Sequence, residues 1–93
     1  MKQYLFRLWV GSESLSEVAE ECAEVGLHVA MLGSEHIYIL HEAYDAEFSD
    51  DHITSLLTPR PGMVPVLWAA LTHEQAVEMR SAYRPGIDRY EEN

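Results

Sequence analysis

Apolar and aromatic residues in the segment 4–10 occupy both faces of an extended chain, which predicts a strand near the centre of a sheet. The apolar positions then change to helical spacing and form one stripe, made of Leu15, Val18, Ala19, Cys22 and Val25. Residues 14–17 have the Ser-x-x-Glu sequence of a capping box, and Gly26 suits the left-handed backbone that ends many helices. We therefore expect a helix between Ser14 and Gly26.

Apolar runs at 27–32 and 36–41 are separated by three residues, a connection of hairpin length. We expect these runs to pair as antiparallel strands. With a three-residue loop, which we prefer, one face of the hairpin carries Leu27, Val29, Met31, Ile37, Ile39 and His41. A two-residue turn would instead put Met31 beside His36.

The segment 42–49 is acidic and is predicted to be irregular. Ser49 and the two aspartates after it suit a helix start, so we expect a short helix from there to about Leu57.

The apolar segment 63–71 predicts a strand. Pro65 cannot donate a sheet hydrogen bond, so it either pushes this strand towards an edge or confines the pairing to the residues after it. Residues 72–75 have the sequence of a second capping box and are expected to open a helix that stops before Pro85. Residues 87–93 are expected to be a loosely held tail.

The resulting order is strand, helix, strand, strand, helix, strand, helix. It predicts an α+β fold with an antiparallel sheet, of the ferredoxin-like split βαβ type with an additional C-terminal helix. A length of 93 residues suits one domain, placed at 1–93. No apolar stretch has the about 18 residues of a membrane span, and a single cysteine, Cys22, fits a reducing cytoplasm.

Charge is the most informative part of the composition. Sixteen Asp and Glu against six Lys and Arg give a net charge of −10, and no Lys or Arg lies between Leu8 and Pro59. Direct binding to nucleic acid or to an anionic membrane is disfavoured, because affinity for phosphates comes mostly from Lys and Arg. A basic protein surface is the favoured partner.

Candidate catalytic and metal-ligating residues lack the spacing of a recognisable site. The nearest cluster of mixed nitrogen and oxygen ligands is His41, Glu42, Asp45, Asp50 and His52. It contains no His-x-x-x-His or EF-hand pattern, and no serine stands in a Gly-x-Ser-x-Gly motif. We expect no enzyme activity, no catalytic residue, no metal site and no cofactor.

The first predicted helix carries four glutamates at i, i+3 and i, i+4 spacing, namely Glu17, Glu20, Glu21 and Glu24. Their mutual repulsion is expected to cost about 1 to 2 kcal/mol in total, and no Lys or Arg in the helix offsets it. One interpretation is a solvated, solubilising face. The other is a row of carboxylates, about 5 to 6 Å apart, that imitates the phosphates of a nucleic-acid strand. Changing Glu20, Glu21 and Glu24 together to Gln is expected to leave stability level or higher.

The leading functional hypothesis is a small acidic inhibitor that binds a basic, nucleic-acid-binding protein. In general character the chain resembles the small acidic inhibitors that phages direct against restriction or CRISPR complexes, and immunity proteins, although no motif specifies either. The predicted partner-binding residues are Glu17, Glu20, Glu21, Glu24, Glu42, Tyr44, Asp45, Glu47, Phe48, Asp50 and Asp51. Tyr44 and Phe48 would be buried anchors of the contact. The alternative is a small-ligand-binding or regulatory domain that acts as a homodimer through an uncovered sheet face.

Overall fold

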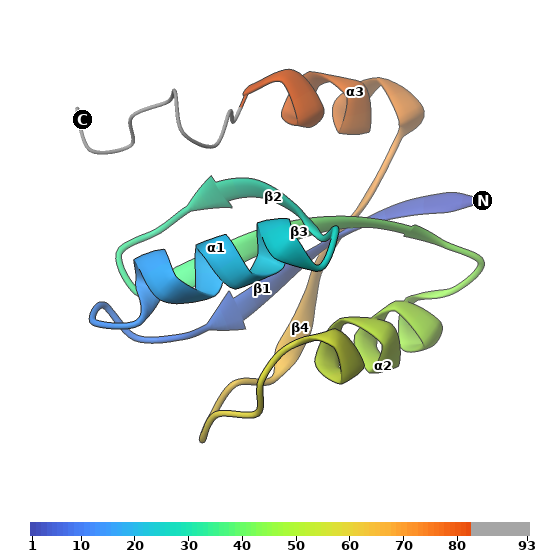
Figure 1. Cartoon of the computed structure of the whole chain (residues 1–93). Coiled ribbons are helices and arrows are strands. Elements are labelled where there is room, and N and C mark those ends of the chain that lie inside the picture. Colours follow the sequence, from blue (N-terminus) through green and yellow to red (C-terminus); the bar gives the residue numbers. More distant parts are fainter. Residues whose placement is uncertain (83–93) are drawn as a thin grey trace.

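Residues 1–82 are described in a computed structural model, and they form three helices and a four-stranded sheet (Figure 1). The elements are β1 (Lys2–Trp9), α1 (Leu15–Glu24), β2 (His28–Leu32), β3 (His36–Ala43), α2 (Ala46–Leu56), β4 (Pro65–Leu71) and α3 (His73–Ala82). The sheet order is β2-β3-β1-β4, and every neighbouring pair is antiparallel. The predicted α+β class with an antiparallel sheet is confirmed. The tail predicted at 87–93 lies outside the described residues.

The first face of the sheet is covered by α1 and α2. Alternate residues of β1 point to this face, and Phe6 and Leu8 are almost fully buried there. They share one core cluster with Val18 of α1, Ile53 of α2 and Ile39 of β3. Both helices therefore belong to the same layer, and α3 lies apart from them (Figure 1).

The second face of the sheet is covered in part by α3. Ala76 of α3 packs with Leu5, Ala30 and Leu40 in a separate buried cluster, and Met79 lies against it. Because β1 contributes to the cores on both faces, it needs apolar residues at consecutive positions. The prediction of a central strand from the apolar run at 4–10 is confirmed.

The predicted cap of α1 is found at its C-terminal end but not at its N-terminal end. Ser14 is the N-cap residue, but its side chain makes no capping hydrogen bond because its backbone is not extended (φ −98°, ψ 2°), so the predicted capping box is wrong. At the other end Gly26 has φ +84°. The Leu27 N–H donates to the Cys22 carbonyl at 2.8 Å and the Gly26 N–H to the Ala23 carbonyl at 3.3 Å, which is a Schellman motif.

The β2–β3 hairpin has the register predicted for a three-residue loop only at the end of the hairpin that is distant from the turn. Val29 pairs with Ile39, as the three-residue loop predicts, but a bulge at Ala30 shifts the register so that Met31 pairs with Tyr38. Met31 therefore lies on the second face instead of the first, and the prediction for this residue is wrong. A one-residue shift of this kind moves a side chain to the other face of a sheet.

Helix α2 begins earlier than predicted. Asp45 is its N-cap residue, with extended backbone (φ −148°, ψ 164°) and a carboxylate that accepts from the Phe48 N–H at 2.7 Å. The predicted irregular segment 42–49 is therefore wrong, since β3 continues to Ala43 and the helix starts at Ala46. Ser49 does not cap the helix because it lies inside it, fully buried.

The last two elements agree with their predictions over the described residues, except that β4 begins at Pro65 and not at Met63. Pro65 is the first residue of an edge strand, a position where proline is tolerated. The Gln75 N–H donates to Thr72 Oγ1 at 3.1 Å and the Thr72 N–H donates to Gln75 Oε1 at 2.9 Å, so the capping box at the start of α3 is confirmed. None of the helices within residues 1–82 combines the length and the apolar character that crossing a membrane requires.

Candidate partner-binding surface

The outer surface of α1 and α2 is rich in acidic side chains. The two helices contain seven acids and neither Lys nor Arg; the acids are Glu17, Glu20, Glu21, Glu24, Glu47, Asp50 and Asp51. Because both helices cover the same face of the sheet, these carboxylates belong to one side of the molecule. This outer surface of α1 and α2 is called the acidic layer below.

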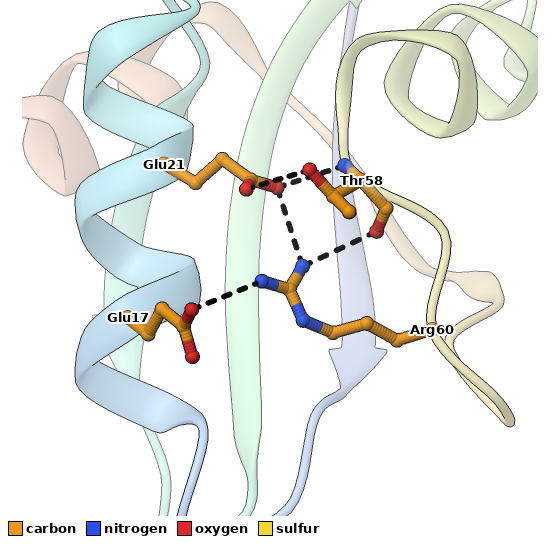
Figure 2. A network of polar contacts seen from close by, with 4 residues as sticks. All are labelled: Glu17, Glu21, Thr58 and Arg60. Carbon is orange, nitrogen blue, oxygen red and sulfur yellow. Dashed lines mark hydrogen bonds and ion pairs between the residues drawn. The ribbon is translucent and has the colours of Figure 1, made fainter.

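A cation from outside the helices reaches the acidic layer (Figure 2). Arg60, in the connection from α2 to β4, donates through Nη1 to Glu21 Oε1 at 3.3 Å, and its Nη2 lies 3.7 Å from Glu17 Oε2. Glu21 also accepts from the backbone N–H of Thr58 at 2.8 Å and from the Thr58 hydroxyl at 2.9 Å. The Glu21 side chain thereby joins α1 to the segment that follows α2.

These contacts divide the four glutamates of α1 into two pairs. The Thr58 backbone N–H lowers the pKa of Glu21 from its ordinary value of 4.5, and the Arg60 and Thr58 side chains lower it further against the opposing effect of burial. No Lys or Arg within α1 offsets the repulsion, but Arg60 and Thr58 from a distant segment stabilise the charge of Glu21. Glu20 and Glu24 are exposed and make no ion pair within residues 1–82.

The predicted anchors lie at the start of α2. Tyr44 is 78% exposed and Phe48 is 59% exposed. Phe48 stacks on His52 with ring centroids 6.0 Å apart and an interplanar angle of 11°. Asp45 has a local structural role as the α2 cap, although it is exposed. The structure thus brings Tyr44, Asp45 and Phe48 together beside the acids of α2.

Glu42 is separated from the other predicted residues. It precedes Ala43 at the end of β3, and its neighbour His41 points to α2, where it is hydrogen-bonded to Ser49. Side chains alternate along a strand, so Glu42 projects from the second face. It contributes to the overall negative field but does not belong to the acidic layer.

Two side chains that could act as nucleophiles, Ser49 and Cys22, are fully buried and inaccessible to a substrate. Ser49 Oγ and His41 Nδ1 share a hydrogen bond of 2.8 Å, but Ser49 is fully buried and its hydroxyl connects α2 to β3 instead of facing a substrate. Burial raises the pKa of the Cys22 thiol to about 11, which keeps it protonated. Across residues 1–82, no three His, Cys, Asp or Glu side chains are grouped so that they could hold a metal ion.

Two partly buried histidines predict a loss of stability below neutral pH. Burial lowers the pKa of His41 from its ordinary value of 6.5, and nearby His52 lowers it further, against the effect of Glu42. Burial and Arg80 lower the pKa of His28, whose Nε2 is buried without a hydrogen-bond partner within the described chain.

A lowered pKa means that the folded state binds the proton less readily than the unfolded state does. The contribution of His28 and His41 is therefore complete above about pH 6.5 and is lost as the pH falls below that value. Urea denaturation at a series of pH values should show this decline, and the double variant His28→Leu/His41→Asn should show a shallower one. A parent and a variant with the same pH profile would contradict the prediction.

Sequence reasoning missed the side chains that reach the acidic layer from distant segments. Thr58 and Arg60 lie 37 and 39 residues from Glu21, beyond any periodic signal. The single available signal was that Arg60 is the first cation after a long acidic span. The comparisons of this chain with protein-family models, with curated proteins and with solved structures each found no match.

Proposed function

We propose that this protein is a non-enzymatic inhibitor that uses the acidic layer to bind a basic, nucleic-acid-binding protein. The observation that carries the proposal is the concentration of seven acids, with neither Lys nor Arg, on two helices of one face. A surface of this kind attracts a positively charged groove over long range and accelerates association with it. We place the interaction in the cytoplasm, where a lone reduced cysteine is stable.

The retained repulsion between Glu20 and Glu24 supports a functional role for these two side chains. They are four residues apart on α1, and like charges at this spacing cost about 0.2 to 0.5 kcal/mol. Glu24 also lies in the last helical turn, where the helix dipole disfavours negative charge. A partner with Lys or Arg opposite them would relieve both effects.

The remaining predicted residues have different roles in the proposal. Glu21 and Glu17 hold α1 in place through Arg60, so that the exposed carboxylates are presented on a fixed helix. Tyr44 and Phe48 supply aromatic area next to the charge, as in protein contacts where aromatic anchors are surrounded by polar groups. Glu47, Asp50 and Asp51 extend the negative charge along α2.

We also propose that the fold is the ferredoxin-like split βαβ arrangement. It is supported by the strand order β2-β3-β1-β4 and by the position of α1 and α2 on one face. α3 is then an addition on the second face. This fold carries no function by itself, so the functional proposal depends on the surface alone.

The first experiment identifies the partner. The immobilised protein is incubated with the heparin-binding fraction of a host extract, and the retained proteins are eluted with rising salt or with duplex DNA. We expect retention of a nucleic-acid-binding protein, release by DNA, and affinity that falls steeply with salt, because exposed charges are screened over about 8 to 10 Å. Affinity for the retained protein that does not change with salt would overturn the proposal.

A matched pair of variants tests which surface binds. Glu20→Gln/Glu24→Gln removes two charges from the acidic layer, and Glu74→Gln/Glu78→Gln removes two at the same spacing from α3 on the other face. We expect the α1 variant to lower affinity for the retained protein about 5- to 100-fold, chiefly through slower association, with stability level or slightly higher. The α3 variant should bind nearly as the parent does. Equal losses in both variants would indicate net charge instead of a specific surface.

A further inference from the structure

A row of large side chains crosses the second face of the sheet beyond α3. Direct register partners join Met31 of β2 to Tyr38 of β3, Tyr38 to Arg7 of β1, and Arg7 to Val66 of β4. Partners in register project to the same face. Trp68 completes the arrangement, since the Arg7 guanidinium carbon lies 4.1 Å from its ring centroid and its ring meets Tyr38 edge-on at 6.1 Å. These five residues are called the open row.

The open row borders the part of the face that α3 covers, and its Tyr38 packs against the buried cluster there. Met31 is 43% exposed, Val66 is 49% exposed and Trp68 is 50% exposed, whereas the α3 end of the same face is buried around Leu5 and Leu40. Exposed apolar side chains on one face of a sheet are typical of a contact surface. Val66 and Trp68 both lie on the edge strand β4, and Met31 lies on β2 at the opposite edge of the sheet. Tyr38 and Arg7 lie between them across β3 and β1.

The charges at the open row select the partner. The two ion pairs within residues 1–82 both belong to Arg60, so Arg7 has a π partner but no carboxylate. One carboxylate borders the same region, because Glu35 accepts from Trp9 Nε1 at 3.2 Å and Trp9 follows Arg7 by two residues on β1. Among residues 1–82, the open row and its border with Glu35 therefore carry one positive and one negative side chain.

We propose that the open row is the contact between two copies of this chain, with Arg7 of each copy facing Glu35 of the other. A twofold contact requires a self-complementary surface, and one cation beside one carboxylate has that property. The acidic layer is unsuited to a contact between two copies, because the seven acids of one copy would face the seven acids of the other. Neither α1 nor α2 contains a Lys or Arg to pair with them. Single-stranded nucleic acid also stacks on aromatic sheet faces. Binding of nucleic acid is disfavoured here, because Arg7 is the one cation of the open row and the chain has a net charge of −10.

This inference goes beyond the proposed inhibitor function and does not depend on it. The open row and the acidic layer are on opposite faces of the sheet, so a dimer formed through the open row leaves both acidic layers exposed. The dimer would present two identical partner-binding surfaces that face outward.

Sedimentation velocity from about 1 μM to about 1 mM tests the association. We expect the mass to rise from 10.6 kDa towards twice that value. Arg7→Glu and Glu35→Lys should each weaken self-association at least about tenfold, because each places like charges opposite one another. An equimolar mixture of the two variants should associate again, since the carboxylate introduced in one variant then faces the ammonium group introduced in the other.

Glu24→Lys is the control for Glu35→Lys, because it makes the same change of charge on the acidic layer, on the opposite face of the sheet. It should dimerise as the parent does. Circular dichroism and thermal unfolding establish that each variant is folded before it is compared. A parent that stays monomeric across the range, or an Arg7→Glu variant with the parent's affinity, would overturn the proposal. A folded mixture that does not associate would exclude the Arg7–Glu35 contact. Saturable binding of single-stranded DNA by the parent, lost in Arg7→Glu, would assign the open row to nucleic acid instead.

Discussion

Phe6→Ala should lower the free energy of unfolding by about 3 to 5 kcal/mol, the range typical of a large aromatic removed from a core. Phe6 is 1% exposed, lies on the central strand, and meets Tyr4 edge-on with centroids 6.3 Å apart. It belongs to the cluster that holds both α1 and α2 on the sheet. Because small domains have about 5 to 15 kcal/mol of stability in total, the variant should be close to unfolding at room temperature.

Phe48→Ala is the matched control for that prediction. Phe48 is 59% exposed and its ring contacts His52, so its removal leaves little cavity. Guanidinium denaturation should find the Phe48 variant within about 0.5 kcal/mol of the parent, while its affinity for the inhibited partner falls. A large loss of stability in this variant would assign Phe48 to the core and remove it from the proposed contact.

Glu21→Gln should lower the free energy of unfolding by about 1 to 2 kcal/mol, since hydrogen bonds to charged groups contribute about 1.5 to 3 kcal/mol and partial exposure reduces this. The glutamine would still accept from the Thr58 N–H, but it would lose the charge that Arg60 and Thr58 now stabilise. The segment after α2 would then be held less firmly against α1. This result would correct the expectation that the triple change of Glu20, Glu21 and Glu24 leaves stability level.

The pH dependence of this loss distinguishes it from a packing effect. The pKa of Glu21 is lowered in the fold, so its contribution to stability is complete above about pH 4.5 and is lost as the pH falls through the folded pKa. The difference between parent and variant should therefore shrink in acid. Glu24→Gln, on the same helix but without the contacts of Glu21, should leave stability level or slightly higher near neutral pH. An unfolding free energy for Glu21→Gln equal to that of Glu24→Gln would show that the contacts of Glu21 are energetically neutral.

Local pattern was sufficient where a structure is stabilised by neighbouring residues. The Schellman end of α1 required only Gly26 after an apolar stripe, and the capping box of α3 required only Thr72 and Gln75 three positions apart. The same reasoning failed at Ser14, whose backbone conformation is set by the turn that enters the helix. It failed again at Ser49, where a buried contact with His41 outweighed the preference of serine for helix ends.

The candidate surfaces divide in the same way. The acids of the acidic layer could be recognised from composition and spacing, because a helix places residues three and four apart on one side. The neutralisation of Glu21 by Arg60 could not be recognised, since it joins residues 39 positions apart. The open row was also invisible in sequence, because Met31 reaches it only through the bulge at Ala30 and Val66 only through the pairing of β4 with β1.

The sequence by itself determined the α+β class, the central position of β1, the edge position of β4 and the excess of negative charge on the helices. Each follows from apolar periodicity, from proline, or from counting charges along a short segment. The tertiary structure decided which carboxylates are left free, which aromatic side chains stay exposed, and which face each residue beyond a bulge occupies. Those outcomes depend on contacts between segments that are distant in the sequence. Packing and strand register determine which residues meet when the chain folds, and residues nearby in sequence do not.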